Sequence, residues 1–598
     1  MTLTKMKKSL LASTTFRNVQ KSPKCLSQLR CVSDQSRPVS ITNKFFKFFT
    51  SAFVTRIVSN ESINDKLPIS WSSIRSKIVS VNEDTRLLHA HLQLLKAGQA
   101  TVKRTEVRTA PIFTASVLKH EKEKLGPYGF FAGSSDILEK NLKQSSHEDP
   151  RIFYNISAPS SAFICGSQGS GKSHTLSCLL ENCLMKSDLS HLDKPLAALV
   201  LHYDSFTSDS RGTPCEAAYL GSNPNIKVKI LCSPANMESI KRTYAGLNVK
   251  IEPLRINQTD LNTKRMLDLM AVNSDDGSMP LYLHSISRIL RELRTEQQKS
   301  NLPFNYSDFK RAVQQCTMLP GQIGPLNQRL DTLKSFMPKS QTDIQHKQQE
   351  DIQLKPNRES KKKKKKGSSP KTNIDLPNKF EENQKDLSGN DWSIQPGTVT
   401  IVDLSCPCVT SDAACALFNM CLSLFLEQPT KIGRIIALDE AHKYMNSSTE
   451  AMTLTSTLLS AIRLQRHLGT RIFISTQEPT ISPTLLDLCS ITIVHRFTSP
   501  NWLQCLRKHI AALDHNQAEL ESNEKPLSEN SPPTNLVPFK INSKKDILQQ
   551  IVKLDVGNAL LFAPSAVVDV DQKLGMDYLK IKVRNRLTTD GGKSIMVE

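Results

Sequence analysis

A loop rich in glycine and serine lies between two apolar stretches in the first third of the chain. Residues 166–173 read GSQGSGKS and fit the pattern G-x-x-x-x-G-K-S without a mismatch. The residues before the loop predict an apolar strand, and those after it predict an amphipathic helix with Leu176, Leu179 and Leu180 on one face. Glycines allow the backbone to turn its N–H groups inward, and a helix N-terminus attracts anions. These residues therefore predict a loop that binds the phosphates of a nucleotide.

The side chains of this loop indicate how a nucleoside triphosphate would be held. Lys172 is placed to reach the terminal phosphates, and the hydroxyl of Ser173 is placed to ligate Mg²⁺. The ring of His174 is expected to make a local hydrogen bond rather than to act as a ligand. The residues predicted to line the nucleotide are Gly166, Ser167, Gln168, Gly169, Ser170, Gly171, Lys172, Ser173 and His174.

A second stretch places two carboxylates at the end of an apolar strand. Residues 435–438 are apolar and lead directly into Asp439 and Glu440. Because the carboxyl ends of strands in an open parallel sheet line the ligand crevice, Asp439 is expected to hold the magnesium shell. Glu440 is expected to polarise a water for in-line attack on the γ-phosphate. The alternative is a pair that only starts a helix, but two adjacent acids here favour hydrolysis.

Three further polar residues are candidates for the same site. Gln477 ends the next apolar strand, where its amide is placed to sense the γ-phosphate or to position the water. The alternative is a polar residue that only ends a strand. Arg466 and Arg496 are candidates for a charge that reaches the nucleotide of a neighbouring subunit, and the alternative for each is a structural or surface arginine.

The elements that must position these groups alternate along the chain. Apolar segments that predict strands alternate with segments that predict helices, which is typical of an α/β fold with a mostly parallel sheet. The strands are expected at 160–165, 196–204, 226–234, 398–405, 434–440, 471–477, 491–497 and 558–564. Helices are expected at 173–185, 412–427 and 451–468.

Changes in composition divide the 598 residues into segments. A chain of this length predicts two to four domains. The expected segments are a basic disordered arm or transit peptide at 1–60, a region of no recognisable fold at 61–150, the first part of the core at 151–254, a helical insertion at 255–337, a lysine-rich disordered linker at 338–392, the second part of the core at 393–513, a polar linker at 514–540, and a last core strand with a basic tail at 541–598.

The charge balance favours an anionic partner. The chain holds 78 Lys and Arg against 57 Asp and Glu, which gives a formal net charge of +21. Nucleic acid, a lipid surface and nucleotides all fit such a balance, although the six lysines at 361–366 contribute part of the excess. No apolar run reaches the roughly 18–20 residues that span a bilayer, so we expect a soluble intracellular protein. The scattered cysteines indicate a reducing compartment.

The compartment stays open between two alternatives. The first 60 residues hold 11 Lys or Arg and a single acid, Asp34, which resembles a mitochondrial transit peptide or else a disordered basic arm. The run of lysines at 361–366 fits a nuclear-import signal, a nucleic-acid contact or a solvated loop. The nucleus and the mitochondrial matrix are therefore both compatible with the sequence.

Four stretches resemble the HerA/FtsK superfamily of P-loop ATPases. They read CGSQGSGKSHT, GTVTIVDLS, IIALDEAHKYM, and RHLGTRIFISTQEP followed by TIVHRF, and the resemblance covers about 155–235 and 393–585. The whole chain is also similar to a group of eukaryotic P-loop proteins known only as nucleotide hydrolases. The resemblance implies a RecA-like core, ATP and Mg²⁺ as cofactors, and a homo-oligomeric ring, hexameric, that moves or remodels nucleic acid, DNA being favoured. The small β-barrel that HerA-type proteins carry before the core is not recognisable in 61–150.

Two other functions stay open at this point. One is a nucleotide-dependent scaffold or switch that binds a protein partner without motor activity. The other is a P-loop kinase for a small molecule, with the helical insertion at 255–337 as a lid.

Overall fold

The computed structural model describes one large α/β unit. The described residues are 106–144, 147–205, 212–269, 281–316, 318, 320–342, 388–429, 431–513, 547–570 and 572–592. The predicted arm at 1–60, the lysines at 361–366 and the predicted linker at 514–540 lie outside the described residues.

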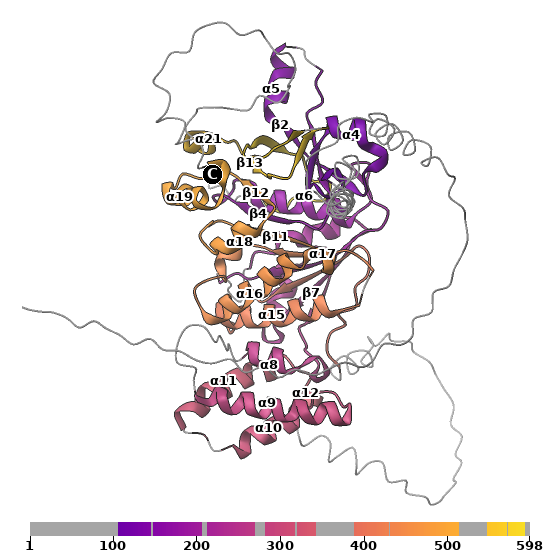
Figure 1. The fold of residues 1–598 in the computed structure, drawn as a ribbon. Coiled ribbons are helices and arrows are strands. Elements are labelled where there is room, and N and C mark those ends of the chain that lie inside the picture. The colour runs from indigo at the N-terminus through magenta and orange to yellow at the C-terminus, as the bar shows by residue number, and fades with distance from the viewer. Residues whose placement is uncertain are drawn as a thin grey trace, which may run out of the picture. The chain divides into compact units, whose positions relative to one another are not determined.

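The strands of the described residues join into one sheet (Figure 1). Their bounds are β1 Ile112–Thr114, β2 Tyr128–Ser134, β3 Arg151–Asn155, β4 Ser161–Cys165, β5 Ser190–His191, β6 Ala197–His202, β7 Lys227–Cys232, β8 Val249–Pro253, β9 Thr398–Asp403, β10 Arg434–Leu438, β11 Thr470–Thr476, β12 Ile491–Val494, β13 Asn558–Phe562, β14 Val567–Asp569, β15 Gln572–Lys573 and β16 Leu579–Val583. The order across the sheet is β15-β14-β1-β3-β2-β16-β13-β12-β4-β11-β10-β6-β9-β7-β8, and β5 pairs with β2.

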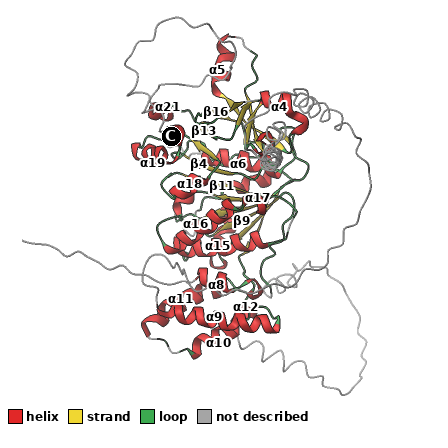
Figure 2. Ribbon diagram, in the orientation of Figure 1, coloured by secondary structure: helices red, strands yellow, loops and turns green. Residues whose placement is uncertain are grey.

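Helices flank the strands (Figure 2). Their bounds are α4 Ala115–Glu121, α5 Ser135–Gln144, α6 Lys172–Leu184, α7 Met237–Thr243, α8 Thr263–Leu269, α9 Leu281–Ser300, α10 Tyr306–Gln315, α11 Pro320–Ser335, α12 Lys339–Thr342, α15 Ser411–Glu427, α16 Thr449–Arg463, α17 Gln465–Leu468, α18 Pro483–Leu488, α19 Pro500–His509 and α21 Ile547–Val552. Short 3-10 turns are η1 Lys122–Lys124, η2 Glu216–Ser222, η3 Pro234–Asn236, η4 Gln258–Asp260 and η5 Ala441–Lys443.

Half of the sheet is parallel, from β12 to β8. The central strands β4, β6, β10 and β11 are buried along their whole length. Strands that are covered on both faces need continuous apolar runs rather than alternating ones, and the sequence of these four strands has such runs. The prediction of an α/β core with a mostly parallel sheet is therefore confirmed.

Side chains that alternate along each parallel strand enter two different cores. Ile435 and Ala437 of β10 pack with α6, η2 and α7 on one face. Ile436 and Leu438 pack with α15, α16 and α18 on the other. Figure 1 shows α15, α16 and α18 next to one another along this face. Because successive side chains of a strand point to opposite faces, one apolar run supplies both layers.

The region at 255–337, expected to be a helical insertion, contains α8 to α11. Helix α8 contacts both α15 and α9, and α9 contacts α10 and α11. Leu283 and Phe309 of these helices belong to the same apolar core as Phe418 of α15. Helix α15 is apolar around most of its circumference because it packs on the sheet and on these helices at once.

Both ends of the predicted disordered linker at 338–392 are ordered, which corrects its expected bounds. Helix α12 lies at its start. At its end the backbone N–H of Asn390 donates to the carbonyl of Arg255 over 2.8 Å, and Trp392 is buried. These contacts join residues more than a hundred positions apart, so composition alone did not predict them.

The other half of the sheet is largely antiparallel and combines the two ends of the described chain. Strands β1, β2 and β3 come from the region at 61–150 for which no fold was recognisable and from the first residues of the expected core. Strand β16 lies between β2 and β13, and β14 pairs with β1. An amino-terminal β-structure is therefore present, and its three adjacent strands lie between two pairs of carboxyl-terminal strands.

The prediction of β13 as the last strand, followed by a basic tail, was wrong. Strands β14, β15 and β16 follow it. In β16 the residues Leu579, Ile581 and Val583 are buried, whereas Lys580 and Lys582 between them are not. The lysines gave this segment a tail-like composition, but their alternation with apolar residues is the pattern of a strand with one covered face.

A buried ion cluster holds the segment after β16 against α6. The carboxylate of Glu181, on α6, is fully buried. It pairs with Arg584 at 2.7 Å (Oε2 to Nη1) and accepts from the Thr588 hydroxyl at 2.6 Å (Oε1 to Oγ1). Burial raises the pKa of Glu181, but the hydrogen bond from Thr588 and the charge of Arg584 outweigh it, and the pKa lies below its usual value. The carboxyl-terminal residues are therefore attached to the helix that follows the phosphate loop.

Replacing Glu181 by glutamine is expected to destabilise the protein by roughly 3–5 kcal/mol, because it leaves a buried guanidinium without its counter-charge. The same change at Glu139 is the control. Its carboxylate is about half exposed and lies 3.7 Å from Lys143 and from Lys580, so a loss of at most about 1 kcal/mol is expected. Urea denaturation of the full chain measures both. Equal midpoints for the two variants would contradict a stabilising role of the cluster.

Candidate functional site

The carboxyl ends of the parallel strands bring the predicted site residues to one edge of the sheet. Strand β11 lies between β4 and β10, and all three run in the same direction. The phosphate loop follows β4, Gln477 follows β11, and Asp439 and Glu440 follow β10. The phosphate loop and the acid pair are therefore one strand apart, although more than 250 residues separate them in the sequence.

The backbone of the phosphate loop has the conformation that its glycines allow. Gly166, Gly169 and Gly171 all have positive φ angles, of 154°, 71° and 108°. A Cβ at Gly166 would lie 2.7 Å from the Cβ of His495, and one at Gly171 would lie 3.2 Å from the backbone nitrogen of Gly557. At these two positions a side chain is excluded both by the φ angle and by a neighbouring segment.

Lys172 folds back over the loop. Its Nζ donates to the carbonyl of Ser167 over 3.0 Å, and the residue is buried. Burial lowers the pKa of the Lys172 ammonium, and the charges of Glu440 and Asp439 oppose this effect. The ammonium thus lies in a partly desolvated position within electrostatic range of both acids, where the negative charge of a phosphate would be a strong partner.

Glu440 has an unusual backbone conformation. Its φ of 49° and ψ of 46° are in the left-handed region, which residues other than glycine seldom occupy. Its Oε2 accepts from Nε2 of Gln477 over 3.2 Å and lies 3.3 Å from Nδ1 of His442. Burial lowers the pKa of His442, and the Glu440 charge opposes this. Local strain of this kind is typical of residues whose side chain must point to a functional position.

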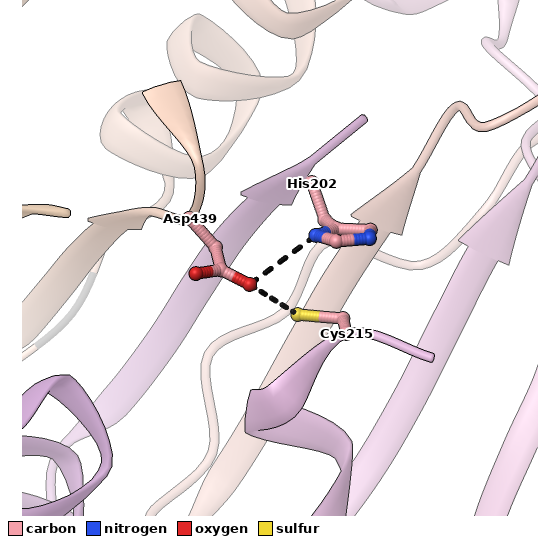
Figure 3. Close-up of side chains that lie close together, drawn as sticks. All are labelled: His202, Cys215 and Asp439. Atoms are coloured by element: carbon pink, nitrogen blue, oxygen red, sulfur yellow. Dashed lines mark hydrogen bonds and ion pairs between the residues drawn. The ribbon is translucent and has the colours of Figure 1, made fainter. Parts of the chain in front are cut away.

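Asp439 is buried and faces two polar side chains that the sequence analysis did not include. Its Oδ2 lies 3.2 Å from Nδ1 of His202 and 3.5 Å from Sγ of Cys215. Figure 3 shows both groups directed at this oxygen, while Oδ1 points away from them. Oδ1 is a buried atom with no hydrogen-bond partner among the described residues.

The three groups shift one another's ionisation. Burial alone would lower the pKa of His202, but Cys215 and Asp439 outweigh burial and hold it well above its ordinary value. Burial would raise the pKa of Asp439, and the contact with His202 lowers it below its ordinary value instead. Burial raises the pKa of the Cys215 thiol to about 12. The carboxylate of Asp439 thus favours the protonated form of His202, and burial disfavours ionisation of the Cys215 thiol.

The structure separates the two candidate arginines. Arg496 follows β12, and its carbonyl accepts from both the N–H and the hydroxyl of Ser167, each over 2.8 Å. Its backbone is therefore part of the phosphate-loop surroundings of its own chain. Arg466 is an exposed residue of α17, just before β11 begins, and so lies at the amino ends of the strands, opposite the phosphate loop.

The side chain of His174, which was also predicted to line the nucleotide, makes the expected local hydrogen bond with the carboxyl-terminal segment instead. Its Nε2 lies 2.8 Å from the carbonyl of Arg584, and its Nδ1 lies 3.7 Å from Asp590. The ring thus contacts the carboxyl-terminal segment, and its side chain is not part of the candidate phosphate site.

A buried histidine supports the loop and was missed. His495 follows β12, its Nε2 lies 2.9 Å from the Thr175 hydroxyl, and its Nδ1 lies 3.1 Å from the carbonyl of Asn558. Because a carbonyl only accepts, Nδ1 carries the proton and Nε2 accepts from Thr175. Burial lowers the pKa of His495 to about 3, so the ring is neutral. The sequence did contain a signal for both missed histidines. His202, His495 and Gln477 each lie at the carboxyl end of an apolar run.

The residues at this edge fit a nucleotide and a divalent cation. The positive-φ glycines leave a loop whose backbone donors can face an anion, and a Cβ at Gly169 would meet no atom within 4 Å. The unpartnered Oδ1 of Asp439 is a hard oxygen donor of the kind that Mg²⁺ prefers. The sharing of one cation by Ser173 and Asp439 stays a prediction.

Three features define the class as a P-loop NTPase fold. They are a phosphate loop between a buried strand and a helix, an acid pair separated from that loop by one strand, and a mostly parallel sheet between two helical layers. Comparison with known structures gives neighbours of this class. VirB4 of Thermoanaerobacter pseudethanolicus is similar with a TM-score of 0.36 and 11% identity over 77% of this chain and 97% of that chain.

The genome packaging NTPase B204 from Sulfolobus turreted icosahedral virus 2, in complex with AMPPCP, is similar with a TM-score of 0.19 and 16% identity, over 33% of this chain and 70% of that chain. At these identities the similarity concerns the fold alone. No protein-family model matches the chain, and no curated protein matches its sequence. Among the described residues, no helix is long and apolar enough to cross a bilayer.

Proposed function

We propose that the protein is a Mg²⁺-dependent ATPase that works as a homo-oligomeric ring on nucleic acid, with DNA as the favoured polymer. The observation that carries the ATPase assignment is the hydrogen bond between Glu440 and Gln477 at the sheet edge that also holds the phosphate loop. A hydrolase needs a base near the γ-phosphate, and a pair of this kind suits the orientation of a water.

Each group has a distinct part in the proposed reaction. Backbone N–H groups of 166–173 and the N-terminus of α6 bind the phosphates. Lys172 would exchange its hydrogen bond with Ser167 for one with a terminal phosphate, which stabilises the charge that develops there. Glu440 would accept a proton from the attacking water. Gln477 would orient both the Glu440 carboxylate and that water. Magnesium, held through Ser173 and Asp439, would supply charge neutralisation on the phosphate oxygens.

The proposal of a nucleic-acid substrate has separate support. The formal charge of +21 favours a polyanion, and the four motifs resemble those of ATPases that act on nucleic acid. Arg496 lies beside the phosphate loop of its own chain, so a residue that acts on a neighbouring subunit is better sought in Arg466, which is exposed. A ring in which α17 of one subunit approaches the phosphate loop of the next would bring Arg466 to the neighbouring nucleotide.

An ATPase assay on the full chain, with and without single-stranded and duplex DNA and RNA, tests this proposal together with a measurement of assembly mass. We expect hydrolysis to rise with DNA, the rise to fall steeply as salt is added, and the mass to increase with nucleotide. Hydrolysis without stimulation or assembly would favour the scaffold or switch, and transfer of phosphate to an acceptor would favour the kinase. Either result would contradict the motor.

A further inference from the structure

The buried cluster of His202, Cys215 and Asp439 carries an inference beyond nucleotide hydrolysis. Its members come from β6, from the turn before η2, and from the end of β10. Each is buried, and one potential ligand atom of each lies within 4.8 Å of those of the other two. A nitrogen, a sulfur and a carboxylate oxygen brought together in this way form the donor set of a transition-metal site.

The distances in the cluster agree with a tetrahedral site. Zinc ligates sulfur at about 2.3 Å and nitrogen or oxygen at about 2.0–2.2 Å, so adjacent ligand atoms of a tetrahedron lie about 3.4–3.6 Å apart. The observed distances from Oδ2 of Asp439 are 3.2 Å to Nδ1 of His202 and 3.5 Å to Sγ of Cys215. Two edges of the tetrahedron are thus close to their required lengths before any movement.

Unpartnered atoms at the cluster also indicate a missing ligand. Nε2 of His202 has no hydrogen-bond partner among the described residues, whereas Nδ1 faces Oδ2 of Asp439 at 3.2 Å, and the residue is only 4% exposed. A buried polar group without a partner costs about 1–3 kcal/mol. A metal bound through Nε2 would remove this cost, and a metal bound through Nδ1 would replace the contact with Asp439.

Cys215 is held in place by a second layer of hydrogen bonds. Its backbone N–H donates to the Tyr244 hydroxyl over 2.9 Å, and that hydroxyl donates to Oδ2 of Asp403 over 2.6 Å. Oδ1 of Asp403 accepts from the N–H of Ser405. Such outer contacts orient the ligands of metal sites, and here they fix the sulfur against Asp439.

The chemistry of the donors selects the metal. Thiolate and imidazole suit zinc and its neighbours, whereas Mg²⁺ requires an octahedral shell of oxygens. With a thiolate, a carboxylate and a neutral imidazole, a divalent ion leaves the buried site without net charge. We propose that His202, Cys215 and Asp439 bind a divalent transition metal of the zinc class, with a fourth position open to water. Oδ1 of Asp439 would remain for the Mg²⁺ of the nucleotide.

Cobalt binding in the absence of nucleotide tests this site independently of the proposed ATPase. The full chain is treated with chelator, and Co²⁺ is added in place of Zn²⁺. We expect one tetrahedral cobalt ion per protein chain. It should give intense visible bands and a thiolate-to-cobalt charge-transfer band in the near ultraviolet. The X-ray absorption spectrum of the zinc-loaded wild type should contain one sulfur at about 2.3 Å and nitrogen or oxygen at about 2.0 Å. A wild-type spectrum without sulfur overturns the proposal without any variant.

Variants assign the bound metal to these residues. Cys215→Ala and His202→Ala are each expected to weaken Zn²⁺ binding by more than ~100-fold, measured by competition with a chromophoric chelator. Cys183→Ala is the matched control for loss of a buried thiol, and Cys408→Ala removes the exposed thiol that would bind metal nonspecifically. Both controls should keep the cobalt bands. Bands that persist in Cys215→Ala, or that disappear in Cys408→Ala, would show that the metal binds elsewhere.

Discussion

Replacing Glu440 by glutamine is expected to stop ATP turnover while leaving nucleotide binding intact. Glutamine has nearly the same size and keeps a contact with Gln477, but its amide cannot accept a proton from water. Removing a general base costs about 10²–10⁴-fold in rate. Among the described residues the carboxylate makes its hydrogen bond and ion pair with Gln477 and His442 and none with the phosphate loop, so the affinity for a nucleotide should change little. Steady-state hydrolysis and binding of a fluorescent ATP analogue measure the two effects separately.

Glu478→Gln is the matched control for this change. Its carboxylate is exposed on the next residue after Gln477, and it accepts none of the hydrogen bonds made within the described part of the site. Turnover of this variant should resemble that of the wild type. Normal hydrolysis by Glu440→Gln would instead show that another group, or no protein group, activates the water.

Replacing Lys172 by alanine is expected to have the second large effect, on binding as well as on turnover. Lys172 is the buried cation of the loop, and Glu440 and Asp439 favour its charged form. Without it, the phosphates meet only backbone donors and two nearby carboxylates. Loss of an electrostatic contact of this type costs about 10²–10³-fold in rate. Calorimetric titration with ATP should also show weakened binding.

Lys186→Ala serves as the control for the lysine. Lys186 is exposed just beyond the carboxyl end of α6, at the opposite end of that helix from the phosphate loop. Both variants should have the wild-type free energy of unfolding within about 1 kcal/mol, because neither change leaves an unpaired buried charge. ATP binding of wild-type strength in Lys172→Ala would mean that the loop does not hold the triphosphate in the proposed way.

Local patterns in the sequence were sufficient for the central parts of the fold. The apolar runs that became β4, β10 and β11 contain their own strand signal, and the glycines of 166–173 specify a loop by their conformational freedom. The position of Gln477 between the phosphate loop and Glu440 could be predicted from the sequence only in part. Its place at a strand end was predictable, but the order of strands that makes it the neighbour of Glu440 was not.

The antiparallel half of the sheet shows why the remainder was not predicted. Strand β1 pairs with β14 through Phe113 and Val567, which lie at opposite ends of the described chain. Both strands are three residues long, so neither has a periodic pattern that stands out from its surroundings. The buried arginine Arg584 was likewise placed in a basic tail, because its partner Glu181 is distant in sequence.

The sequence by itself determined the phosphate loop, the acid pair and the layered α/β class, since each depends on neighbouring residues whose types limit the local backbone. Only the tertiary structure decided that Asp439 faces His202 and Cys215, that Arg496 lies against its own loop, and that the carboxyl-terminal residues lie on α6. These contacts join segments that are distant in sequence and that the order of strands in the sheet places side by side. That order depends on how whole faces are buried, which no short stretch of sequence specifies.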